Sequence, residues 1–143
     1  MHGMKFSEFD SLTWPGLQMY FDTCLLPVTG LTGRETPAEM TDKAAAVGDW
    51  LSPLETAFKG RAVTLPAYHY FDAEASADGE LLERRCDALK AAGFRFVVVV
   101  SGTAGLLKAL PASADLLVQP ARPEERPDAE AICRPVAALW KDA

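Results

Sequence analysis

The amino-acid sequence predicts a small α/β domain, a three-layer sandwich with about four strands in a mainly parallel, Rossmann-like sheet and helices on both faces. Short apolar blocks alternate with longer segments of helical periodicity, as in βαβ units. The strongest block, residues 94–100 (FRFVVVV), is apolar toward both faces, which is typical of an interior parallel strand. The chain has 143 residues, of which 49% are hydrophobic and 24% charged, so one packed domain over residues 1–143 is expected.

Four strands are expected, at residues 22–28, 62–70, 94–100 and 116–119. The second should be broken or bulged near Pro66, because proline cannot donate a hydrogen bond to a neighbouring strand. Strands joined through helices run parallel, so the turns that follow them should gather at one edge of the sheet. At the opposite edge, Asp22 and Arg61 lie at neighbouring strand starts and could form an ion pair with a structural role.

The longest helix is predicted to begin at Thr36-Pro37-Ala38-Glu39, a capping box with proline in the first helical position. This helix should end at Gly60. Ser52-Pro53-Leu54-Glu55 is a second capping box, so either one kinked helix or two collinear helices would satisfy the pattern. Further helices are expected at residues 7–12, 78–92, 103–110 and 128–141.

Charge and composition argue against several classes of partner. The chain has 14 Lys and Arg against 20 Asp and Glu, a net charge of −6, so no basic surface for nucleic acid is expected. No apolar segment approaches the about 20 residues of a membrane span, and none resembles a leader, so a cytoplasmic location is predicted. Three cysteines without a CxxC pair, with only two histidines, indicate free thiols, and no cofactor or metal site is expected.

The turns at the carboxyl edge of the strands supply the candidate binding residues. Ser101-Gly102-Thr103 leads from the strongest predicted strand into an expected helix start, where free N–H groups and the helix dipole favour a phosphate or carboxylate. Two GxxG segments, 30–33 and 102–105, lack the complete P-loop and GxGxxG patterns, so ordinary turns with helix caps are the alternative. The predicted ligand-binding residues are Thr29, Gly30, Arg34, His69, Ser101, Gly102 and Thr103.

No catalytic residue is predicted. His69 is the one internal histidine and would need an orienting partner, such as Asp72 or Glu74, to act as a general base. Alternation along a strand does not place these carboxylates on the face of the imidazole, so a structural or surface histidine is favoured. Ser101 lies outside any GxSxG motif, so it has no nucleophile context.

Several sequence blocks together resemble a known family. They are 20–23 (YFDT) followed by 25–28 (LLPV), then 58–61 (FKGR), 65–68 (LPAY) with Tyr70, and the helix–strand unit at 89–100. This set is similar to the YpiF-like family of uncharacterised Firmicute proteins, domain of unknown function 2487. The resemblance implies a bacterial protein, and it implies no activity and no site residues, because the family has none assigned.

Two functions remain open on the sequence. The first is a non-catalytic accessory or protein-interaction factor, which could also form a homo-oligomer; Trp14, Trp50 and Trp140 are candidate interface anchors, although the last two also fit core stripes. The alternative is a domain that binds a small anionic ligand or nucleotide in the crevice at the carboxyl ends of the strands.

Overall fold

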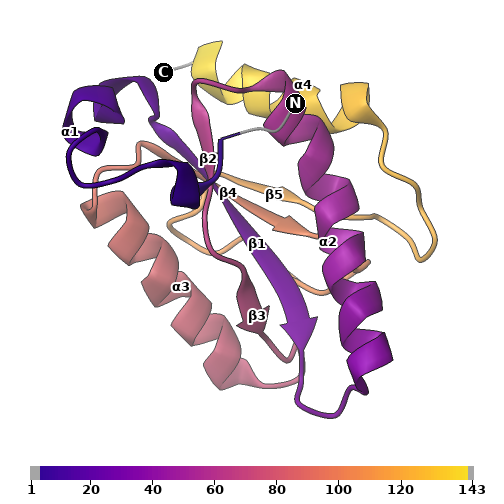
Figure 1. The fold of residues 1–143 in the computed structure, drawn as a ribbon. Helices are drawn as coiled ribbons and strands as arrows, with labels where there is room; N and C mark the ends of the chain where they lie inside the picture. The colour runs from indigo at the N-terminus through magenta and orange to yellow at the C-terminus, as the bar shows by residue number, and fades with distance from the viewer. Residues whose placement is uncertain (1–3, 142–143) are drawn as a thin grey trace.

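The fold, described over residues 4–141 by a computed structural model, is built on a five-stranded parallel sheet of order β2–β1–β4–β5, with β3 pairing with β1 beyond β2 (Figure 1). Every pairing in it is parallel, which confirms the predicted fold class. The expected second strand is two short strands, separated at residues 65–67 around Pro66. The strands are β1 (Thr23–Leu31), β2 (Ala62–Thr64), β3 (Tyr68–Tyr70), β4 (Phe96–Ser101) and β5 (Leu116–Val118).

Helices cover both faces of the sheet, as the sequence predicts. Helices α2 (Pro37–Ala57) and α4 (Ala129–Lys141) pack against one face, and α3 (Ser76–Ala91) packs against the other (Figure 1). Side chains of β1 alternate between the two layers: Cys24, Leu26 and Val28 face α3, whereas Leu25 faces α2 and α4. This alternation with burial on both faces is what a central parallel strand requires.

Helix α2 begins with the expected capping box, in which the Thr36 hydroxyl accepts from Glu39 N and the Glu39 carboxylate accepts from Thr36 N. Of the two arrangements considered at Pro53, one uninterrupted helix is observed. The second capping box is not formed, because the Glu55 carboxylate accepts instead from Lys5 Nζ at 2.6 Å and Thr64 Oγ1 at 2.7 Å. A local helix-start signal is thus overridden by a tertiary contact with the edge of the sheet.

The helix expected over residues 103–110 is not formed, and turns and bends occupy residues 102–109 instead. Gly105 adopts a φ of +69°, which breaks the helical path. The Gln119 side chain accepts from Leu107 N at 3.3 Å and donates to Leu107 O at 2.9 Å, so it replaces helical bonds of that residue. Consequently, no helix starts at the end of β4, and the dipole expected beside Ser101 is missing.

The N-terminal segment also differs from the prediction of a helix at 7–12. It contains a 3₁₀ turn at Phe6–Glu8, then α1 (Trp14–Leu17) and a second 3₁₀ turn at Gln18–Tyr20. The Trp14 ring packs against Phe9 at a centroid distance of 5.0 Å and against Phe94 at 6.1 Å. Aromatic packing against the α3–β4 connection therefore sets the course of this segment more than its own helical pattern does.

At the amino-terminal edge, the predicted pairing of Asp22 with Arg61 is confirmed. Arg61 Nε and Nη2 each donate to one Asp22 carboxylate oxygen at 3.0 Å. The same guanidinium lies 4.0 Å from the centroid of the Trp140 ring, whose Nε1 donates to Thr23 Oγ1 at 2.9 Å. These contacts attach α4 to the first strand, so Trp140 has a structural role here.

The cysteines and the hydropathy of the helices complete the description. All three thiols are free; Cys24 and Cys86 are buried, and Cys133 is half-buried. Within residues 4–141, none of the helices combines the length and the apolar character needed to cross a bilayer.

Candidate functional site

The candidate site is the carboxyl edge of the sheet, where parallel strands bring their trailing turns together. Strand β1 extends to Leu31, beyond its predicted end at Val28, so Thr29 and Gly30 are strand residues and not loop residues. Thr29 is 2% exposed, and a hydrogen bond of 2.9 Å joins its Oγ1 to His69 Nδ1. Two of the predicted binding residues are therefore already partners of each other.

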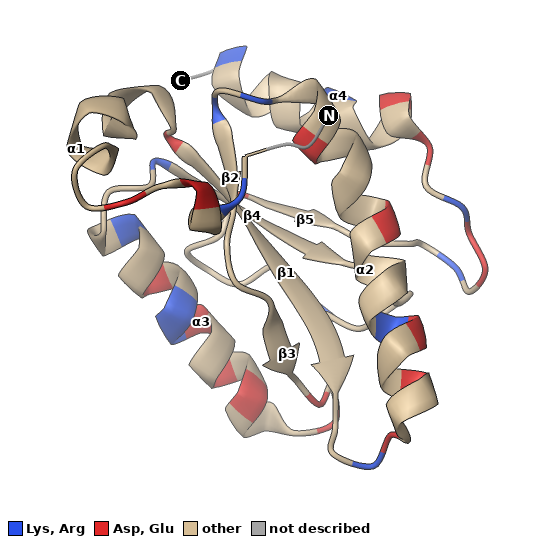
Figure 2. Ribbon diagram, in the orientation of Figure 1, with Lys and Arg blue, Asp and Glu red and all other residues tan. Residues whose placement is uncertain are grey.

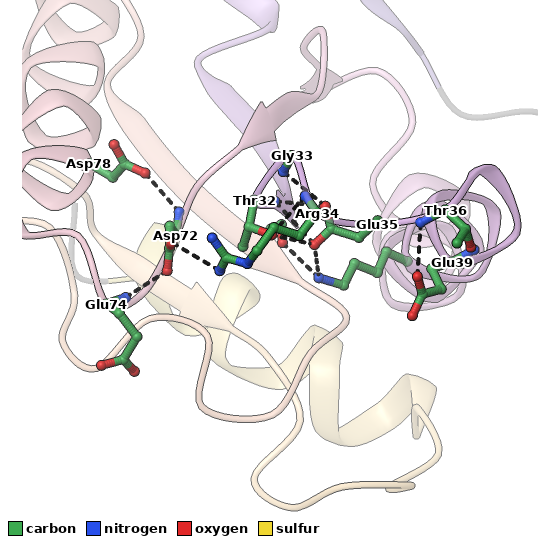
Figure 3. A network of polar contacts seen from close by, with 11 residues as sticks. Thr32, Gly33, Arg34, Glu35, Thr36, Glu39, Asp72, Glu74 and Asp78 are labelled. Atoms are coloured by element: carbon green, nitrogen blue, oxygen red, sulfur yellow. Dashed lines mark hydrogen bonds and ion pairs between the residues drawn. The ribbon is translucent and has the colours of Figure 1, made fainter.

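The loop from β1 to α2 is organised around the carboxylate of Glu35 (Figure 3). Thr32 N and Gly33 N donate to it at 2.9 and 3.0 Å, and Thr32 Oγ1 donates at 2.8 Å. Lys43 Nζ reaches across from α2 to donate to the same carboxylate at 2.9 Å and to Gly30 O at 3.0 Å. The hydrogen bond from Lys43, reinforced by those from Thr32, holds the pKa of Glu35 far below its ordinary range despite the burial of the carboxyl.

This arrangement has a direct chemical meaning. Backbone N–H groups that converge in a turn, beside a lysine, form a site that suits an anion. Here Glu35 of the same chain supplies that anion. Glu35 was not among the predicted site residues, although Thr32-Gly33-Arg34-Glu35 has the same T-x-x-E spacing as the capping box that follows it.

Arg34 faces away from that cluster and joins the loops after β1 and β3 (Figure 3). Its Nη2 lies 3.4 Å from Asp72 Oδ2, and the guanidinium is largely exposed. Asp72 Oδ1 accepts from Glu74 N at 2.9 Å, and Asp72 N donates to Asp78 Oδ2 at 2.8 Å. The N–H of Glu74 is the main cause that lowers the pKa of Asp72, with a contribution from Arg34, so this carboxylate is stable as an anion.

The turn after β4 is shaped by packing and not by a helix start. Ser101 is fully buried, and its Oγ accepts from Thr103 N at 3.1 Å. A Cβ built on Gly102 would lie 2.4 Å from the carbonyl carbon of Ala46, so glycine lets the backbone of α2 approach this turn closely. Ser101, Gly102 and Thr103 thus have identifiable structural roles.

The crevice between the ends of β1 and β4 is the position where open α/β sheets bind ligands. Gly30, with a φ of +84°, lies at a bulge of β1, where its register against β3 shifts. A Cβ built on Gly30 would lie 2.9 Å from the Leu106 side chain. Leu106 on one side and the backbone of α2 on the other therefore occupy this crevice.

Cavities lie on both sides of the filled crevice, and different members of the predicted binding set line them. Thr29 and His69 line two adjoining cavities of about 220 and 310 Å³ beside α2 and β3. Gly102 lines a cavity of about 510 Å³ between α2 and residues 120–127. Arg122 and Arg126 line the latter together with acidic side chains, namely Asp49, Glu124 and Glu125.

In the part of the chain that the structure describes, the side-chain hydrogen bond of His69 is the one with the buried Thr29 hydroxyl. Across residues 4–141, no three side chains of His, Cys, Asp and Glu gather in a way that could hold a metal ion. Of the two carboxylates considered as orienting partners for His69, Asp72 pairs with Arg34 and Glu74 lies 3.8 Å from Lys108 Nζ.

Comparison with known proteins identifies a family. The family model described as "Protein of unknown function (DUF2487)" matches residues 13–132, from α1 into the first turn of α4. No curated protein and no solved structure matches the chain. The match covers most of the chain and confirms the resemblance that the sequence blocks indicate. The chain therefore belongs to the DUF2487 family of proteins of unknown function.

Proposed function

We propose that this domain is a non-catalytic accessory factor that acts in the cytoplasm through contacts with another protein. One observation carries the proposal: the converging donors of the β1–α2 loop, which would hold an anionic ligand in related architectures, are bonded to Glu35 of the same chain. A ligand at this position would have to displace a carboxylate that is held by three donors from Thr32 and Gly33 and by Lys43.

The surrounding geometry supports the same proposal. Leu106 fills the space beside Gly30, and the backbone of α2 fills the space beside Gly102. Of the predicted binding residues, Thr29 and His69 line cavities separate from the one that Gly102 lines, so these three do not converge on one molecule. Three free cysteines are in keeping with a reducing compartment.

The small-anion alternative keeps one specific observation in its favour. Arg122 and Arg126 line the cavity of about 510 Å³ at the carboxyl ends of β4 and β5, where Gly102 also lies. Three carboxylates, those of Asp49, Glu124 and Glu125, line the same cavity, so its formal charge is not positive. Because the carboxylates outnumber the arginines, a simple phosphate or carboxylate fits this cavity poorly. Binding of a small anion is therefore the second candidate function.

The two functions are separated by titrating the purified chain with inorganic phosphate and with ATP in a thermal-unfolding assay. A ligand at about 100 times its Kd would stabilise the chain by about 2.7 kcal/mol, a shift of several degrees in Tm. We expect no shift for the wild type. A shift that disappears in Arg34→Ala, His69→Ala or Arg122→Ala would contradict the accessory-factor proposal and establish an anion site.

The positive test is reconstitution. Tagged full-length chain, isolated from its own cells, should retain one protein in constant stoichiometry, and that protein, purified separately, should bind the chain in isothermal titration calorimetry. Arg34→Ala and His69→Ala should leave this affinity unchanged. A chain that retains no protein, and that turns over an ester or phosphoester substrate at a rate abolished by one of these substitutions, would refute the proposal.

A further inference from the structure

A groove lies between α3 and the connection from β4 to β5. Helix α2 connects β1 to β2 and helix α3 connects β3 to β4, whereas residues 102–115, between β4 and β5, contain turns and no helix. Leu106, Leu107 and Ala114 of this connection pack into the same core layer as α3. Between the connection and α3 lies a cavity of about 370 Å³, a volume within the range of binding pockets.

The walls of the groove are mainly apolar. Phe71 and Leu82 lie toward the core, and the far wall is the run 106–111. Leu110 is 43% exposed and is among the exposed large hydrophobic side chains of the described residues. Gly79 of α3 lines the groove, and a Cβ built there meets no atom within 4 Å, so the helix surface at this point is uncovered.

The rim of the groove is acidic. Glu80 and Glu83 line it from α3, and Asp87 continues the same helical edge one turn further on, where Ser113 Oγ donates to it. Lys108 is the one cation among the lining residues, and its Nζ lies 3.8 Å from Glu74 Oε1 in a largely exposed pair. Figure 2 shows acidic residues on the N-terminal half of α3, and the whole chain has a net charge of −6.

We propose that this groove binds a basic amphipathic helix of a partner protein. Apolar side chains at i, i+3, i+4 and i+7 of such a helix would enter the groove, and Lys or Arg beside this stripe would face Glu80 and Glu83. The bound helix would lie between α3 and the β4–β5 connection. The inference rests on the proposed accessory function and identifies the surface and the class of partner that this function would use.

The charge of the rim selects this occupant over the others. A second copy of the same acidic chain would bring like charges together at the rim, which disfavours self-association through the groove. An acidic or neutral helix would lose the attraction of Glu80 and Glu83 and would keep only the apolar contacts.

The test uses the full chain and a fluorescein-labelled synthetic peptide of about 16 residues, long enough to form a helix when bound, with a leucine stripe and lysines elsewhere. Anisotropy titrations are expected to show saturable binding. A peptide of the same composition with a scrambled stripe, and one with glutamate in place of lysine, should bind at least about tenfold more weakly.

Two variants act on the groove and one serves as a matched control. Gly79→Leu fills the groove. The chain should remain folded, because leucine favours the helix more than glycine does and no atom lies within 4 Å of the added Cβ. Leu110→Lys alters the opposite wall at an exposed position and adds a positive charge that repels the basic peptide. Each should weaken peptide binding about tenfold or more. Gly48→Leu makes the same change on α2, also in open space, and should leave binding unchanged.

The outcomes separate this inference from the function on which it rests. Absence of saturable peptide binding, equal binding by Gly79→Leu and wild type, or equal binding of the scrambled peptide would refute the groove. A dimer in sedimentation that Gly79→Leu dissociates would assign the groove to a second copy and would also refute it. If a reconstituted partner binds Gly79→Leu as tightly as wild type, the accessory function stands and only the groove is wrong.

Discussion

Replacing Gly102 with alanine tests whether the turn after β4 is a packing device or a ligand-binding loop. The added Cβ would lie 2.4 Å from the carbonyl carbon of Ala46 and 2.6 Å from Val47 N, both atoms of the α2 backbone. Because these atoms belong to a helix of 21 residues, no single side chain can rotate to relieve the contact. The helix or the turn must move by about 1 Å to restore an ordinary contact distance.

The magnitude follows from two opposing effects. Overpacking of this kind costs about 3 kcal/mol, at the upper end of the usual range, because backbone and not side chain must shift. Alanine also lowers the conformational entropy of the unfolded chain, which stabilises the fold by about 0.7 kcal/mol. This gain applies because Gly102 does not adopt a positive φ. The net expectation is a loss of about 2 kcal/mol in the free energy of unfolding, or about 8 °C in Tm for a chain of this size.

Urea unfolding followed by far-UV circular dichroism measures the effect. With a slope of about 2 kcal/mol per molar urea, the midpoint of Gly102→Ala should fall by about 1 M at unchanged slope. Gly48→Ala is the matched control, because it lies inside α2 with no atom within 4 Å of the added Cβ. Helix propensity should make this variant about 0.5–1 kcal/mol more stable than wild type.

The reasoning is refuted if Gly102→Ala unfolds within about 0.5 kcal/mol of the wild type, which is the size of an ordinary surface substitution. It is equally refuted if Gly48→Ala and Gly102→Ala lose the same stability, because the close approach to α2 would then have no energetic consequence.

Three further outcomes follow from named contacts. Trp140→Phe removes the donor to the buried Thr23 hydroxyl and should cost about 1 kcal/mol in urea unfolding; an unchanged midpoint would contradict this role. The pKa of Glu35 is lowered in the folded chain, so its carboxylate stabilises the fold above about pH 4.3, and this stabilisation is lost as the pH falls further. The urea midpoint of Glu35→Gln should therefore fall less steeply with acidification than that of the wild type. Parallel plots of midpoint against pH for the two proteins would contradict this. Burial raises the pKa of Cys24 to about 12, so a disulfide reagent should modify Cys133 first in the native chain and Cys24 only after unfolding.

The strands and most helices were predictable because their signals are local. Residues 94–100 have no polar face, so they fit an interior strand, and Pro66 marks the break between β2 and β3. The capping box at Thr36 forms as its sequence indicates. Even the pairing of Asp22 with Arg61 could be predicted, since parallel strands place their starting residues at one edge.

The errors arise where distant residues override local patterns. Residues 103–110 contain helix-forming Leu, Lys and Ala, yet Gln119, at the end of β5, bonds the backbone of Leu107 and the segment turns inward. Glu35 could not be recognised from the sequence as the anion of the β1–α2 loop, although it is close in sequence to the predicted binding residues. Its position depends on a hydrogen bond from Lys43, which lies two turns into α2. Spacing alone does not reveal which donors are already bonded.

The sequence by itself determined the class of the fold, the parallel direction of the strands and the edge where their turns meet, because periodicity, caps and connection rules act over a few residues. Only the tertiary structure decided what occupies that edge. Leu106 beside Gly30, α2 against Gly102 and Lys43 of α2 on Glu35 are contacts between separate elements, and their close packing leaves space for a ligand or denies it. The same packing leaves the β4–β5 connection without a helix and places the groove, with its apolar walls and acidic rim, beside α3.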